Sequence, residues 1–116
     1  MNSYYLAKLV FKIEVQNNKD VQQFDEQFRI FTAPTPGLAL SNAHLIGKKE
    51  ESTFLNSNKN LVSWIFIGVS ELTSLQTLSN GGLIFSQTHE TYHPEGYLQM
   101  VQQKNNGLEL FTSISL

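Results

Sequence analysis

The chain has 116 residues, of which 41% are hydrophobic and 11% aromatic, so it has the length of one domain and enough apolar side chains for a core. Its formal net charge is −2 and its Lys and Arg residues are scattered, which argues against the concentrated basic face of a nucleic-acid-binding protein. Cysteine is absent, so disulfides, thiolate metal sites and cysteine nucleophiles are excluded.

The sequence shows no targeting or membrane-spanning segment. The first residues lack the basic start and the apolar stretch of a signal peptide. The longest apolar run, residues 64–69, is far shorter than the roughly 20 residues that cross a bilayer. We therefore expect a cytoplasmic protein of one domain, residues 1–116, without a membrane partner.

The opening segment has the clearest periodic pattern. Apolar and polar residues alternate over residues 5–15, which predicts a long, half-buried strand. Residues 17–20 supply turn chemistry, and a second strand follows, with Phe24, Phe28 and Ile30 on one of its sides. Because the connection is short, we expect the two strands to form an antiparallel hairpin.

A helix is predicted next. Thr35 followed by Pro36 is typical of a helix start, because proline at the first helical position has no N–H to leave unpaired. Ala39 and Ala43 then recur at helical spacing, and Gly47 stands where a helix can end. The small side chains predict a helix that lies close to the sheet.

The middle of the chain predicts a second hairpin, from residues 52–55 and 61–69. Its second strand is apolar on both sides, which is typical of a central strand that is covered on both sides. Leucines at positions 72, 75 and 78 predict a short helical turn. Another strand is expected over residues 83–88.

The C-terminal stretch allows two interpretations. Apolar residues after Pro94 favour a helix that ends at residues 105–107, with 105–116 as an extended tail or edge strand. The alternative is a hairpin across Asn106-Gly107, because residues 108–114 alternate, so that residues 97–103 are either helix or strand. The expected fold is α+β, with an antiparallel sheet of about five strands in ββαβββα order, packed by one main helix and a C-terminal helix.

Residues His89, Glu90 and His93 form the letters of the zinc-protease pattern H-E-x-x-H. That chemistry needs a helix, because only there do two histidines four residues apart face one metal ion. Here the pattern leaves a predicted strand and ends at Pro94, and the residue before a proline is pushed away from helical geometry. A surface segment with two titratable histidines is therefore favoured over a zinc site.

Three further residues are candidates for binding. Glu26 lies on the apolar side of its strand, where an ion pair with a lysine of the neighbouring strand is favoured over a functional carboxylate. Glu51 belongs to a charged cluster after the first helix. Trp64 is the type of residue that anchors partners, although an apolar strand favours a core position for it. No catalytic residue and no cofactor are predicted.

Several stretches resemble one known family. Over residues 4–104 the chain resembles the short bacterial proteins of the domain of unknown function 4288 family, in the form common among Bacteroidetes. The resemblance is carried in order by Tyr4-Tyr5-Leu6-Ala7-Lys8, Phe24-Asp25-Glu26-Gln27-Phe28-Arg29, Ile46-Gly47-Lys48-Lys49-Glu50-Glu51, Ser52-Thr53-Phe54-Leu55-Asn56 and Val62-Ser63-Trp64-Ile65-Phe66. It implies a helix near residues 97–104 and no activity, cofactor or catalytic residue, and the histidine pattern departs from it.

Two classes of function follow from these patterns. The favoured one is a non-enzymatic interaction or accessory domain that self-associates, because edge strands and aromatic side chains can pair with a partner. The alternative is a small-molecule-binding or hydrolytic domain with a cleft between sheet and helix, in which Glu26, Glu51 or the histidine segment would act. Its zinc-dependent form is disfavoured by the proline.

Overall fold

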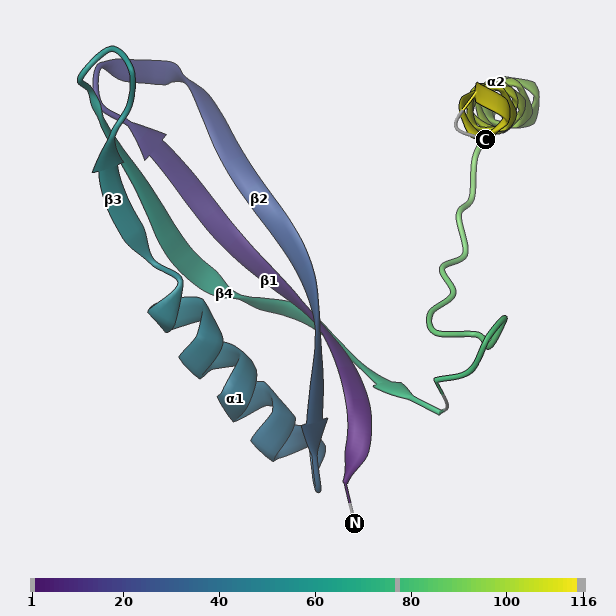
Figure 1. Cartoon of the computed structure of the whole chain (residues 1–116), viewed down its shortest axis with the longest axis horizontal. Helices are drawn as coiled ribbons and strands as arrows, with labels where there is room; N and C mark the ends of the chain where they lie inside the picture. Colours follow the sequence, from purple (N-terminus) through teal and green to yellow (C-terminus); the bar gives the residue numbers. More distant parts are fainter. Residues whose placement is uncertain (1, 77, 115–116) are drawn as a thin grey trace. The chain divides into compact units, whose positions relative to one another are not determined.

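The computed structural model describes residues 2–76 and 78–114. These residues fall into two compact units, Met1–Phe85 and Ser86–Leu116. The first unit holds strands β1 (Ser3–Val15), β2 (Asn18–Ala33), β3 (Ser52–Leu55) and β4 (Leu61–Leu75) and helix α1 (Pro36–Lys49), and the second holds helix α2 (Pro94–Ile114) (Figure 1). The α+β class is confirmed. Within the described residues no helix is long and apolar enough to cross a membrane.

The strands form one antiparallel sheet in the order β2-β1-β4-β3. In the part of the chain that the structure describes, this sheet has four strands, so the expectation of about five was wrong. Both predicted hairpins are present. In the first, Asn17 takes a φ of 68°, a left-handed conformation that asparagine tolerates in tight turns.

Helix α1 begins where the sequence predicts. The Thr35 side chain accepts a hydrogen bond from the Leu38 N–H (3.2 Å), and Pro36 occupies the first helical position. The helix covers one face of the sheet with its smallest residues, because Ala39, Ala43 and Gly47 are its buried positions (Figure 1). A Cβ atom at Gly47 would run into the ring of Phe66, so this glycine sets how closely the helix approaches.

The core lies between α1 and the sheet. Every second residue of β1 from Tyr5 to Phe11 is buried there. The Phe11 ring packs against the rings of Trp64 (6.3 Å between centroids) and Phe66 (5.5 Å) from the adjacent strand β4. The periodicity that predicted the first strand therefore also identified its core side.

Strand β4 is longer than the sequence predicted. It runs on to Leu75, so the helical turn expected at leucines 72, 75 and 78 was wrong. The register with β1 shifts twice, between Lys8 and Leu9 and between Val10 and Phe11, and each shift leaves one extra residue in β4. These bulges place Val69 and Leu72 on the core side at a spacing of three, which resembles the period of a helix.

The chain after β4 also differs from the expectation. Residues 83–88 form no strand in the structure; instead, the ring of Phe85 packs against Phe28 (6.5 Å between centroids). Of the two C-terminal interpretations, the helix is confirmed and the hairpin is wrong, and α2 continues through residues 105–107 to Ile114.

The expected extended tail is therefore absent over 105–114, whereas residues 115–116 lie outside the described residues. The continuation has a local cause, since the Asn105 side chain donates to the Glu109 carboxylate one turn later (3.2 Å).

Candidate interaction surface

The sheet has a second face, opposite α1, which we call the open face. It is formed by alternate residues of β1 and the residues that pair with them on β2, because paired side chains point to the same side of a sheet. The open face consists of Tyr4, Leu6, Lys8, Val10 and Lys12 on β1 and Thr32, Ile30, Phe28, Glu26 and Phe24 on β2.

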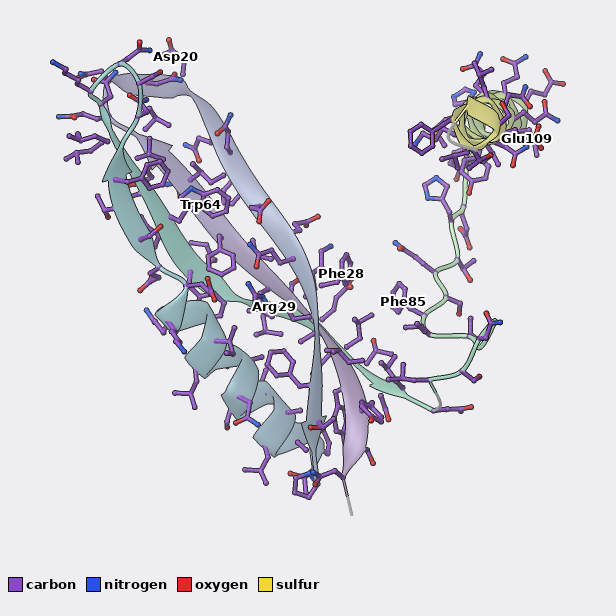
Figure 2. The ribbon with its side chains drawn as sticks, in the orientation of Figure 1. Asp20, Phe28, Arg29, Trp64, Phe85 and Glu109 are labelled. Carbon is purple, nitrogen blue, oxygen red and sulfur yellow. The ribbon has the colours of Figure 1, made fainter. Side chains whose placement is uncertain are left out.

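Strand β2 presents its apolar side to this open face. Phe24, Phe28 and Ile30 keep 55%, 55% and 51% of their surface exposed. The opposite side of β2, which faces α1, carries polar residues from Gln23 to Arg29 and contributes Phe31 and Ala33 to the core. Figure 2 shows Arg29 on the side of α1 and Phe28 on the other side of the strand. Over this part of β2 the apolar side therefore faces away from the core.

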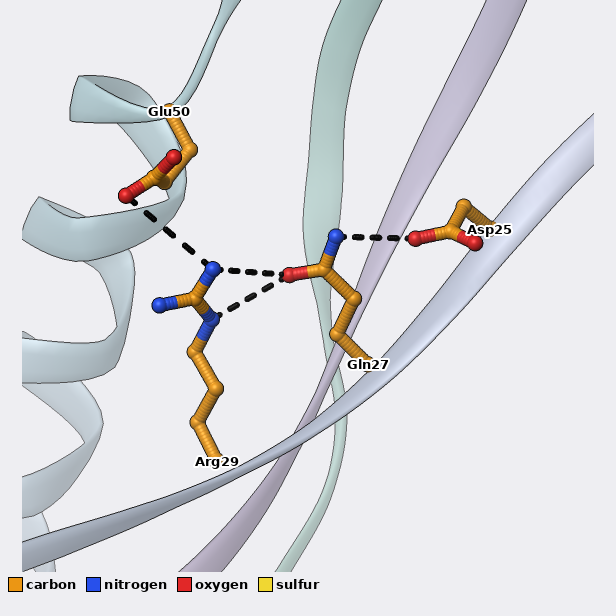
Figure 3. A network of polar contacts seen from close by, with 4 residues as sticks. All are labelled: Asp25, Gln27, Arg29 and Glu50. Carbon is orange, nitrogen blue, oxygen red and sulfur yellow. Dashed lines mark hydrogen bonds and ion pairs between the residues drawn. The ribbon is translucent and has the colours of Figure 1, made fainter.

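The polar side of β2 is satisfied by its own network (Figure 3). The Gln27 amide donates to the Asp25 carboxylate (2.8 Å), and the Arg29 guanidinium donates twice to the Gln27 amide oxygen (3.1 and 3.0 Å). Arg29 also reaches the Glu50 carboxylate at the end of α1 (4.0 Å). These bonds hold Asp25, Gln27 and Arg29 on the α1 side of β2, opposite Phe24 and Phe28 on the open face.

Charged residues of both signs lie in the middle of the open face. The Lys8 ammonium contacts the Glu26 carboxylate (3.1 Å), so the structure contains the ion pair with a neighbouring strand that was favoured for Glu26. The same ammonium lies over the ring of Phe28, 5.5 Å from its centroid. The Glu26 side chain keeps 57% of its surface exposed and is open to a further partner.

The other two binding candidates lie elsewhere. The Glu51 carboxylate accepts a hydrogen bond from the Phe66 N–H (2.9 Å) and thereby extends the pairing of β4 beyond the first residue of β3. Trp64 is partly buried against the core cluster on the α1 side. Glu26, Glu51 and Trp64 are therefore not brought together into one site.

The histidine pattern lies before α2 and outside any helix, as Pro94 predicted. His93 precedes the helix and its carbonyl accepts a bond from the Tyr97 N–H (3.2 Å), while the His89 ring stacks on the Tyr97 ring (5.3 Å). Among the described residues no group of three or more metal-binding side chains is present. The arrangement that H-E-x-x-H zinc chemistry requires is not formed.

A cavity of about 560 Å³ lies at the turn of the first hairpin rather than between sheet and helix. It is lined by residues 12–18 together with Gln22, Leu61 and Ser63, so neither Glu26 nor Glu51 faces it. The cleft that the alternative function needs is not formed by this cavity.

Of the open-face residues, Glu26 was the one binding candidate in the sequence, although Phe24, Phe28 and Ile30 were expected on one side of the second strand. The alternation of apolar and polar residues on β2 was visible. What it could not show is which side of β2 faces α1, because the register of the hairpin decides that.

Comparison with known proteins gives the family. The family model described as a domain of unknown function (DUF4288) matches residues 4–86. The chain belongs to this family. The DUF4288 match ends at the boundary between the two units, so it covers the sheet and α1 and leaves α2 outside. No curated protein and no solved structure matches the chain.

Proposed function

We propose that this DUF4288 protein is a non-enzymatic protein-interaction domain that self-associates through its open face. The observation that carries the proposal is the orientation of β2, which directs Phe24, Phe28 and Ile30 away from the core. Contiguous exposed apolar side chains are typical of interaction surfaces, because burying them against a partner removes apolar area from water.

The charges of the open face favour a partner that is itself of mixed charge. Lys8 and Glu26 neutralise each other, so the surface does not select a strongly basic or acidic molecule. A second copy of this chain, with a net charge of −2, meets that requirement, and symmetric dimers are the commonest assemblies of soluble proteins.

Sedimentation velocity at tens of micromolar tests the proposal. We expect the unaltered chain to form a dimer, and Ile30→Glu to form monomers because a carboxylate would be buried in the apolar contact. Leu45→Glu is the matched control, since Leu45 is an exposed leucine on α1 and lies outside the open face. A monomeric unaltered chain, or equal dissociation by both variants, would contradict the proposal.

A further inference from the structure

Helix α2 has an exposed apolar stripe. Tyr97, Val101, Leu108 and Phe111 are exposed and follow one another at spacings of four, seven and three, which places them on one side of the helix. Lys104 lies on the same side, midway along the stripe. All described side chains of α2 from residue 94 to 113 are exposed, although the Tyr97 ring stacks on the His89 ring of the same unit.

We infer that α2 of one copy lies along the open face of a second copy, with the two copies exchanging their helices. The inference rests on the proposed self-association and names the segment that covers the open face. Its first support is that most of each surface is uncovered in its own unit. The open face keeps exposed apolar residues although Phe85 packs on Phe28, and the stripe of α2 is exposed although the His89 ring stacks on Tyr97 at one end of it.

The two surfaces agree in length. At 1.5 Å per residue the 21-residue helix is about 31 Å long. The open face extends along β1 from Tyr4 to Lys12, which is about 26 Å at 3.3 Å per residue. A single helix laid along the strands therefore covers the open face from end to end.

The charges also correspond. Lys104 has two apolar stripe residues before it and two after it, and among the described residues it forms no ion pair. Glu26 lies between Phe24 and Phe28 on the open face, with more than half of its side chain exposed. An ion pair between Lys104, midway along the helix, and Glu26, midway along the apolar row of β2, would fix the position of the helix on the open face.

The area fits a stable dimer. One side of the whole helix, about 31 Å long and 10 Å wide, covers about 300 Å², and a reciprocal exchange buries two such helix sides and two sheet faces. The total of about 1,200 Å² reaches the range of specific protein interfaces. A single helix on a single sheet would bury only half of this area.

The absence of cysteine makes a direct test available. We would mix two single-cysteine chains of different mass, Glu26→Cys and Lys104→Cys, and oxidise them. A disulfide between the two chains is expected, because the exchange brings these positions together, whereas Leu45→Cys in place of Glu26→Cys should not form it. A bond only when both cysteines are on one chain would show that α2 covers its own sheet and would overturn the inference.

A matched pair on α2 gives the second measurement. Leu108 and Leu110 are exposed to the same extent, 63% and 64%, but Leu110 lies on the opposite side of the helix from the stripe. Leu108→Glu should weaken dimerisation about tenfold or more, and Leu110→Glu should leave it unchanged.

Sedimentation of the two leucine variants separates the two proposals. If Ile30→Glu dissociates the dimer and Leu108→Glu does not, self-association stands and the helix exchange is wrong. If the unaltered chain is a monomer, both are wrong.

Discussion

The two faces of the sheet are made from the same kinds of residues but differ in their surroundings. On the α1 side, Leu9 and Phe11 are almost completely buried, whereas on the open face Phe24 and Phe28 expose half of their surface. The difference originates in the first hairpin, where odd-numbered residues of β1 pair with odd-numbered residues of β2. The buried apolar residues of β1 are odd-numbered, whereas Phe24, Phe28 and Ile30 of β2 are even-numbered, so these two sets point to opposite sides of the sheet.

This comparison shows that amphipathicity and core position are separate properties of a strand. On β1 the residues from Tyr5 to Phe11 that face α1 are buried, whereas on β2 the apolar residues Phe24, Phe28 and Ile30 face away from α1. A shift of the hairpin by one residue would place Phe24 and Phe28 under α1 and the polar network on the open face. The observed register therefore leaves an apolar surface that does not pack against α1.

The largest expected effect is the difference in stability loss between one substitution on the α1 side of the sheet and one on the open face. Phe11→Ala should lower the free energy of unfolding by about 3–5 kcal/mol, because it leaves a cavity beside Trp64 and Phe66. Phe28→Ala should lower it by about 1 kcal/mol or less at dilutions where the chain is a monomer. Urea denaturation measures both, and equal losses would show that the open face is already covered within one chain.

A smaller effect tests how closely α1 approaches the sheet. Gly47→Ala should destabilise the protein by about 2–3 kcal/mol, because the added methyl group would meet the Phe66 ring. Gly37→Ala is the control in the same helix; its methyl group would lie at an ordinary contact distance of 4.0 Å from the Thr35 hydroxyl, and we expect a gain of about 0.5–1 kcal/mol. Thermal unfolding of both variants compares them, and a stabilised Gly47→Ala would show a looser helix contact.

The smallest effect concerns the edge where β3 begins. Glu51→Ala should cost about 1 kcal/mol, because the Phe66 N–H loses its hydrogen-bond acceptor in a partly buried position. Glu50→Ala, which removes only the 4.0 Å contact with Arg29, should stay within about 0.5 kcal/mol of the unaltered chain. Hydrogen exchange of the Phe66 amide gives a local readout, and unchanged protection in Glu51→Ala would refute the role of this carboxylate.

Much of the fold could be predicted from local patterns. The first hairpin followed from its alternation and its turn residues, and α1 followed from Thr35 and Pro36. The ends of β4 and α2 could not, since Leu72 and Leu75, which suggested a helical turn, lie in a regular stretch of β4 on opposite sides of the sheet, and side-chain bonds carried α2 past Gly107. A spacing of three fits a helix, and Asn106-Gly107 normally ends one, so both local patterns were misleading.

The candidate site was less predictable than the fold. The H-E-x-x-H pattern pointed to His89 and His93 as a candidate site. The open face has no sequence motif and depends on the register between β1 and β2. The ion pair of Glu26 could be foreseen, because it needs only a lysine on the adjacent strand. A surface that depends on the pairing of two strands is invisible in either strand alone.

The bulges of β4 also determine where this strand can change in length. Ile67 and Ser70 are the extra residues, and the residues on each side of them already have partners on β1. Without Ser70, Val69 and Glu71 would still oppose Leu9 and Lys8 in a regular ladder, and no side chain would change sides. An insertion or deletion within the regular parts of β4 would move the side chains that follow it to the other face of the sheet. Ile67 and Ser70 are therefore the positions at which β4 best tolerates a change in length.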